Sequence, residues 1–264
     1  KFVKRVGERV AVELAKRGVE TVEDLLYHLP FRYEDRLNPV PMSALQAGTM
    51  ASVIGEVRGS AVLRTRSGPL FEMTVGQGLS SVKCMWFHGA YLRDKFQVGR
   101  MIALYGKLEA SRSSAGKLKM IQPQWEILPE PGEPDSEFAM LEVGRIVPVY
   151  ETLGGTTAWG AKLGSKWLRR VIWGLFEELE RQQASESASQ QRGEWAETLP
   201  SALRRRLGLP ERLAALRAVH FPEAGTPMTE QMSGATPGHR RLILEELFYL
   251  ELGLELKRRR MRER

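Results

Sequence analysis

The chain has 264 residues, of which 42% are hydrophobic and 27% charged, which is the balance of a folded globular protein rather than a disordered one. Its formal net charge of +7 and its pI near 9.6 favour polyanionic partners. The single cysteine, Cys84, excludes an internal disulfide and argues against a cysteine-based zinc site. No apolar run approaches the length of a membrane span, so we expect a protein of the reducing cytoplasm with no membrane partner.

Residues 1–42 carry apolar side chains at helical spacing, which predicts a small N-terminal helical segment. Thr21 is a good N-cap, and Asp24 stands at the position that completes a capping box. Together with Glu23, Glu34 and Asp35, Asp24 also allows a carboxylate metal site. A charged, capped helix end is the favoured interpretation.

Residues 43–130 change to the period-two alternation of β-strands and predict an OB-fold, a five-stranded β-barrel. A short helix is expected between the third and fourth strands, over residues 91–96, and Pro123 interrupts the fifth strand. Loops rich in Gly, Ser and Arg are expected at 58–68, 76–81 and 111–116. The expected strands cover residues 51–57, 70–75, 82–87, 101–108 and 118–128.

Residues 131–264 are predicted to form a helical extension, so the whole chain is expected to be an α+β protein with the OB domain between two helical segments. A polar Gln/Ser run at 181–193 predicts a surface loop, and the stretch 222–239, which carries Gly, Pro and Thr, is expected to be mobile. The last expected helix, 240–264, has an apolar stripe of the kind that packs against another surface. Its basic end either touches DNA or is the polar end of a helix that docks on another domain.

Several motifs in this order resemble those of the RecG helicases, and the resemblance covers nearly the whole chain. They are residues 22–36 (VEDLLYHLPFRYEDR), 85–92 (MWFHGAYL), 146–150 (IVPVY), 216–222 (LRAVHFP) and 240–248 (RRLILEELF). The second motif is similar to the wedge motif of that family. The last resembles the helix that leads into the family's motor.

Two aromatic residues of the wedge motif, Phe87 and Tyr91, are the candidate DNA-stacking residues. Exposed rings on an OB surface stack on unpaired bases. The residues alone favour a buried, structural role for both rings, and the resemblance reverses that preference. In RecG proteins these two positions stack on bases at the branch point. Trp86 points to the opposite face of its expected strand and is the better core candidate.

Basic residues in or beside the expected loops are the candidates for phosphate contacts, because such loops border the usual OB ligand face. Each one taken singly is more simply read as solvated charge, whereas the cluster favours DNA contact. The loop candidates are Arg64, Arg66, Arg112, Lys117 and Lys119, and Lys83 joins them because it lies on the same expected strand face as Phe87.

The nucleotide-binding loop of the family's motor is missing from this sequence. A Gly-x-x-x-x-Gly-Lys-Ser/Thr loop cradles phosphates, but Lys107 and Lys117, which both follow a glycine, precede Leu. We therefore expect a fragment without catalytic residues, cofactor or metal, with ATP and Mg belonging to the absent motor.

The resemblance implies a monomeric bacterial protein of the cytoplasm and nucleoid that binds branched DNA, namely replication forks and Holliday junctions. The resemblance further implies that the protein is the wedge of a helicase that regresses stalled forks and that the single-stranded DNA-binding protein is a partner. Two alternatives stay open. One is an OB-fold protein-interaction module, and the other is an OB accessory domain of an RNA-binding enzyme.

Overall fold

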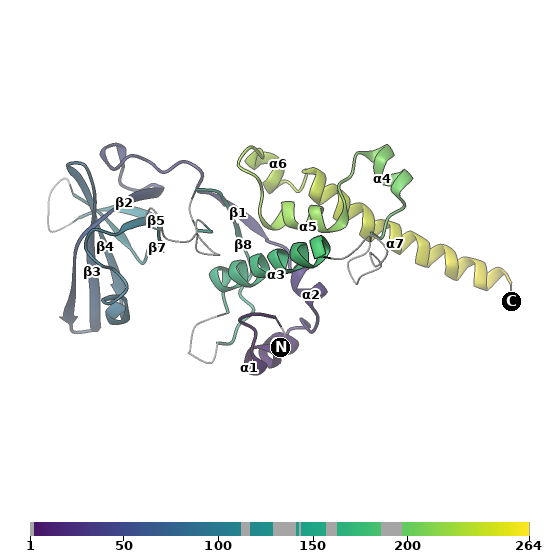
Figure 1. The fold of residues 1–264 in the computed structure, drawn as a ribbon, viewed down its shortest axis with the longest axis horizontal. Coiled ribbons are helices and arrows are strands. Elements are labelled where there is room, and N and C mark those ends of the chain that lie inside the picture. Colours follow the sequence, from purple (N-terminus) through teal and green to yellow (C-terminus); the bar gives the residue numbers. More distant parts are fainter. Residues whose placement is uncertain are drawn as a thin grey trace. The chain divides into compact units, whose positions relative to one another are not determined.

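The computed structural model describes residues 3–111, 117–128, 141–142, 144–156, 163–185 and 197–263 (Figure 1). Two compact units make up the chain, one of residues 34–147 and the other of residues 1–33 with 148–264. The chain passes between them twice, in β1 (Arg32–Asp35) and β8 (Ile146–Val149), which pair in a two-stranded sheet. The division predicted at 42/43 and 130/131 stays a prediction.

The unit of residues 34–147 is built on a six-stranded sheet in the order β2-β3-β4-β6-β5-β7, in which β2 also pairs with β5. Neighbouring strands run antiparallel except β4 and β6, which are parallel. Strand order and the short helix after β4 agree with the OB arrangement. The elements are η1 (Met42–Ala44), β2 (Met50–Thr65), β3 (Gly68–Gln77), β4 (Ser80–Phe87), η2 (Gly89–Leu92), β5 (Met101–Ala110), β6 (Leu118–Ile121) and β7 (Gln124–Ile127).

Three details of the predicted OB domain need correction. The sheet has six strands rather than the five of the expected barrel, because proline cannot donate a ladder hydrogen bond and Pro123 separates β6 from β7. The expected loop 58–68 is mostly strand, since β2 runs to Thr65 and reaches β3 through Arg66 and Ser67 alone. The short helix begins at Gly89 and ends at Leu92, earlier than expected.

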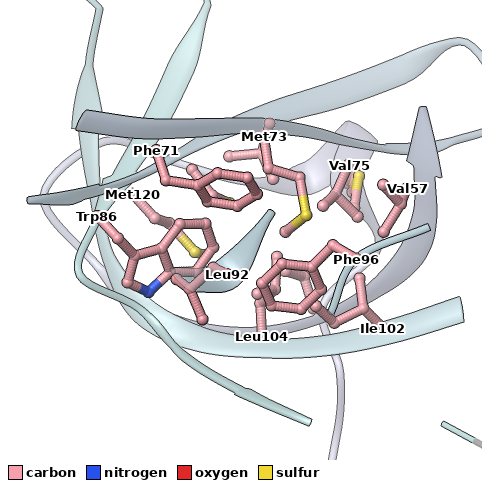
Figure 2. Packing of buried hydrophobic residues seen from close by; sticks show 14 of the residues in the cluster. Val57, Phe71, Met73, Val75, Trp86, Leu92, Phe96, Ile102, Leu104 and Met120 are labelled. Atoms are coloured by element: carbon pink, nitrogen blue, oxygen red, sulfur yellow. The ribbon is translucent and has the colours of Figure 1, made fainter. Parts of the chain in front are cut away.

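The core of this unit lies inside the curved sheet, as the alternation predicts. Phe71, Trp86 and Phe96 pack together (Figure 2), with ring centroids 5.8 Å apart in every pairing. Trp125 meets Phe96 edge-on, with ring centroids 4.8 Å apart. The Trp86 indole Nε1 donates to the Pro123 carbonyl oxygen at 3.1 Å, which satisfies the one polar atom of that buried ring. Trp86 is therefore a core residue, as predicted from its strand parity.

The second unit is helical and joins the two ends of the chain. It contains a helix that the sequence did not predict, α6, in the stretch expected to be mobile, and it shares β1, which lies in a segment predicted as helical. The predicted loop at 181–193 begins inside α3, and residues 186–196 lie outside the described ones. The helices are α1 (Glu8–Ala15), α2 (Val22–Leu26), α3 (Ser165–Ser185), α4 (Ser201–Leu207), α5 (Arg212–His220), α6 (Met228–Met232) and α7 (Pro237–Arg262).

Buried polar contacts connect the N-terminal segment to α5. The Tyr33 hydroxyl donates to the Val219 carbonyl oxygen at 2.8 Å, and His220 Nε2 lies 2.7 Å from the Leu26 carbonyl oxygen. Thr21 and Asp24 form the predicted capping box at α2. The carboxylate of Asp24 is thus used in helix capping.

The last helix, α7, is buried only in its first turns, through Arg241, Leu242 and Glu245. Arg241 pairs with Glu245 at 2.8 Å and with Glu197 at 2.6 Å. The predicted apolar stripe of α7 is exposed in this structure; its members are Ile243, Leu247, Leu250 and Leu254.

Candidate nucleic-acid interface

Phe87 and Tyr91 both face solvent beside the buried core. Phe87 ends β4, and the alternation of that strand turns Trp86 inward and Phe87 outward. Phe87 is 48% exposed and Tyr91 is 67% exposed, whereas Trp86 is 4% exposed. The buried role that the residues alone favoured is therefore wrong for these two rings, and both are available for stacking on a base.

The backbone between the two rings is tightly constrained. His88 adopts a left-handed conformation, with φ of 54°, that turns the chain from β4 into η2. A Cβ at Gly89 would lie 2.8 Å from Trp86 Cβ and 2.9 Å from Phe71 Cβ, so only glycine lets η2 lie directly on the sheet. Leu92 is fully buried at the end of η2, which anchors the turn that carries Tyr91.

Lys95 is a further residue of this surface, and the sequence reasoning missed it. Its Nζ lies 5.6 Å from the ring centroid of Tyr91 and 5.8 Å from that of Trp125. Both distances suit cation–π contacts. The i, i+4 spacing of Tyr91 and Lys95 is the sequence signal that could have identified the contact.

Strand register places two leucines in a row with Phe87 on the outer face of the sheet. Leu63 of β2 is opposite Leu70 of β3, and Leu70 is opposite Phe87 of β4. Leu63 and Phe87 are both exposed, while Leu70 is covered between them. The row is an apolar strip that leads away from the Phe87 ring.

Lys83 and Lys119 are neighbours on the same outer face. They are register partners across the parallel β4–β6 pair. Lys83 Nζ lies 2.8 Å from Glu72 Oε1, and Lys119 Nζ lies 3.5 Å from Glu109 Oε2. The structure thus brings together two of the predicted phosphate-binding lysines and gives each a carboxylate partner.

The other predicted basic residues are more dispersed. Arg64 lies in β2 rather than in a loop, and alternation puts its side chain on the face opposite Leu63. Arg66 is exposed in the β2–β3 turn, and Lys117 is exposed just before β6. Arg112 lies outside the described residues. The DNA contacts assigned to all eight residues stay predictions.

Metal binding and thiol chemistry find little support in the described residues. The described residues contain no group of three or more His, Cys, Asp or Glu side chains that could hold a metal ion. Burial raises the pKa of the Cys84 thiol, so this side chain stays neutral. In the part of the chain that the structure covers, none of the helices is long and apolar enough to cross a membrane.

Comparisons with known proteins find one family and several similar chains. Residues 1–161 match the family described as the RecG wedge domain. The ATP-dependent DNA helicase RecG of Escherichia coli K12 is 30% identical over 251 residues, which are 94% of this chain and 32% of the relative. The same-named helicase of Haemophilus influenzae is 27% identical, with 95% of this chain and 32% of the relative covered.

A solved structure shares the fold. It is titled "Structure of RecG bound to three-way DNA junction", and it matches with a TM-score of 0.67 and 24% identity over 98% of this chain and 31% of that one. The present chain spans about a third of the length of these curated relatives.

Proposed function

This chain belongs to the RecG wedge domain family, and we propose that it binds branched DNA, with Phe87 and Tyr91 stacking on bases at the point where the strands part. The DNA is a replication fork or a Holliday junction. The similar solved structure holds RecG on a three-way DNA junction, which supports this class of ligand.

The exposure of the two rings carries the proposal. Each ring is exposed although the residue next to it in sequence is buried, Trp86 beside Phe87 and Leu92 beside Tyr91. Unpaired bases offer π-faces, and each stacked base contributes roughly 1–3 kcal/mol whatever its sequence. Paired bases inside a duplex cannot offer these faces, so stacking discriminates a branch point from a continuous duplex.

Phosphate contacts supply the second part of the binding free energy. The net charge of +7 favours DNA in general, and Arg66 and Lys117 are exposed where a phosphate can reach them. Such contacts position the duplex arms without reading sequence. We assign the same role to Arg64, Lys83, Arg112 and Lys119.

The whole protein is proposed to be a RecG-like helicase that unwinds and regresses stalled forks in the bacterial cytoplasm. ATP and Mg are assigned to a motor, and the chain described here is assigned the wedge. We also propose that it acts as a monomer and that the single-stranded DNA-binding protein is a partner, both on the family resemblance alone.

The proposal is tested by titrating the chain with a three-way fork, a continuous duplex and a single strand at several salt concentrations. We expect tightest binding to the fork, with a log K against log salt slope of about −0.9 per duplex phosphate contact. Phe87→Ala combined with Tyr91→Ala should weaken fork binding by roughly 1–3 kcal/mol per stacked base and hardly change duplex binding. Equal losses on the two DNAs would exclude a stacking wedge.

A further inference from the structure

The two lysines on the outer face of the sheet are each held by a carboxylate of the same unit. Lys83 pairs with Glu72 and Lys119 pairs with Glu109. All four side chains are between a fifth and a half exposed, so the pairs stand at the surface where DNA would meet them.

The position of these pairs relative to Phe87 follows from the strands. Lys83 and Phe87 are four residues apart on one face of β4, a separation of about 13 Å at the usual strand rise. Lys119 is the register partner of Lys83, and Glu109 is the register partner of Lys119. A DNA strand that runs from the Phe87 ring along this face therefore meets two lysines whose positive charges are already balanced by Glu72 and Glu109.

A phosphate that approaches Lys83 has to compete with Glu72 for the same ammonium group. The carboxylate is tethered, so it recaptures the lysine as soon as the phosphate moves away. A surface ion pair is weak, so the competition lowers affinity without preventing contact. Affinity changes of this kind act mostly through the dissociation rate.

We infer that Glu72 and Glu109 limit the affinity of the outer face for DNA phosphates by competing for Lys83 and Lys119. The inference rests on the proposed function, because a wedge has to let go of each phosphate as the strands move across it. Because of the carboxylates, each lysine holds a DNA phosphate only briefly and does not fix the DNA in place.

The test compares Glu72→Gln and Glu109→Gln with Glu56→Gln. Glu56 is an exposed residue of β2 in the same unit, so its replacement makes the same change in net charge away from the two lysines. We expect each of the first two variants to bind fork and duplex about two- to fivefold more tightly than wild type. Slower dissociation should account for the gain, and the duplex salt slope should steepen by about 0.9. Thermal melting checks that each variant is folded.

Lys83→Met supplies the second half of the cycle. In that background Glu72→Gln should gain no more affinity than Glu56→Gln does, because the lysine it would release is gone. Two results overturn the inference. One is that Glu72→Gln in the wild-type background gains no more affinity than Glu56→Gln, and the other is that Glu72→Gln keeps its full gain when Lys83→Met is present. Failure of the proposed function is seen separately, as a wild-type chain that does not prefer forked DNA to duplex.

Discussion

The Tyr150 hydroxyl donates a hydrogen bond to Nδ1 of His220 across 2.8 Å, and both side chains are buried. The direction of the bond follows from the other ring nitrogen. His220 Nε2 lies 2.7 Å from the Leu26 carbonyl oxygen, which can only accept, so Nε2 carries the proton and Nδ1 is free to accept. The pair requires a neutral imidazole, and burial lowers the pKa of His220 to about 4.

We therefore expect the chain to lose stability as the pH falls below the ordinary histidine pKa. The folded-state pKa of about 4 is below the unfolded value near 6.5, so the unfolded state binds the extra proton first. The free energy of unfolding should be level above about pH 6.5 and about 2 kcal/mol lower at pH 5. Denaturant titrations at pH 7, 6 and 5 measure it.

His220→Phe should flatten this pH dependence, although not completely, because burial also lowers the pKa of His239. His88→Gln is the control for the loss of an exposed histidine. A His220→Phe profile as steep as that of wild type would contradict the assignment.

Replacing the adjacent aromatic residues Trp86 and Phe87 should have opposite consequences. Trp86→Ala removes a buried ring that packs on Phe71 and Phe96, and should cost about 3–5 kcal/mol. Phe87→Ala should leave the melting temperature nearly unchanged, because its ring faces solvent. A large fall in melting temperature for Phe87→Ala would show that the ring supports the fold.

Gly89→Ala should displace η2, the short helix that carries Tyr91. The new Cβ would meet Trp86 and Phe71 at less than 3.0 Å, so η2 has to move, at a cost of about 1–3 kcal/mol. Gly59→Ala is the matched control, because nothing lies within 4 Å of a Cβ at that position. Melting and fork titrations of both variants test the expectation. Equal stability of the two would mean that the close approach at Gly89 is unimportant.

Lys95→Met keeps most of the side-chain stem and removes the charge beside Tyr91 and Trp125. The contact orients the Tyr91 ring that is proposed to stack, and a cation–π contact at an exposed site contributes about 0.5–1 kcal/mol, so its loss should weaken fork binding by at most about two- to fivefold. Lys107→Met removes an exposed lysine of β5 as a control for net charge. Similar losses of fork affinity for the two variants would show that Lys95 contributes only its net charge.

We expect no nucleotide hydrolysis by this chain with or without DNA. Neither Gly-Lys pair continues with the Ser or Thr that a phosphate-binding loop needs for Mg. Phosphate release is measured with a DNA-stimulated ATPase as the positive control. DNA-stimulated release by the pure chain, at a rate that follows its concentration, would refute the expectation.

Much of the OB unit could be predicted from local patterns. Strand alternation made Trp86 the better core candidate, and Pro123 marked the break that separates β6 from β7. The length of β2 could not be predicted in this way. Its second half, with residues such as Arg58 and Arg64, reads as a polar loop and is strand because β3 pairs with it to Thr65.

The candidate interface was only partly accessible from the sequence. The residues alone favoured buried rings for Phe87 and Tyr91, and the resemblance to a known family supported exposed ones. The partners of Lys83 and Lys119 come from other strands, so no spacing along the chain reveals Glu72 and Glu109. Lys95 lies four residues from Tyr91, but its second ring, Trp125, is thirty residues away.

Local sequence patterns were enough to predict the capping box at α2, most strands of the OB unit and the long helices α3 and α7, because these depend on near neighbours and on backbone chemistry. Tertiary structure alone decided that residues 1–33 join the C-terminal helices in one unit, through contacts such as Tyr33 with Val219 and His220 with Leu26. It also decided which charges on the outer face are balanced. Both depend on pairing between distant segments, whose register and burial are selected by the fold as a whole.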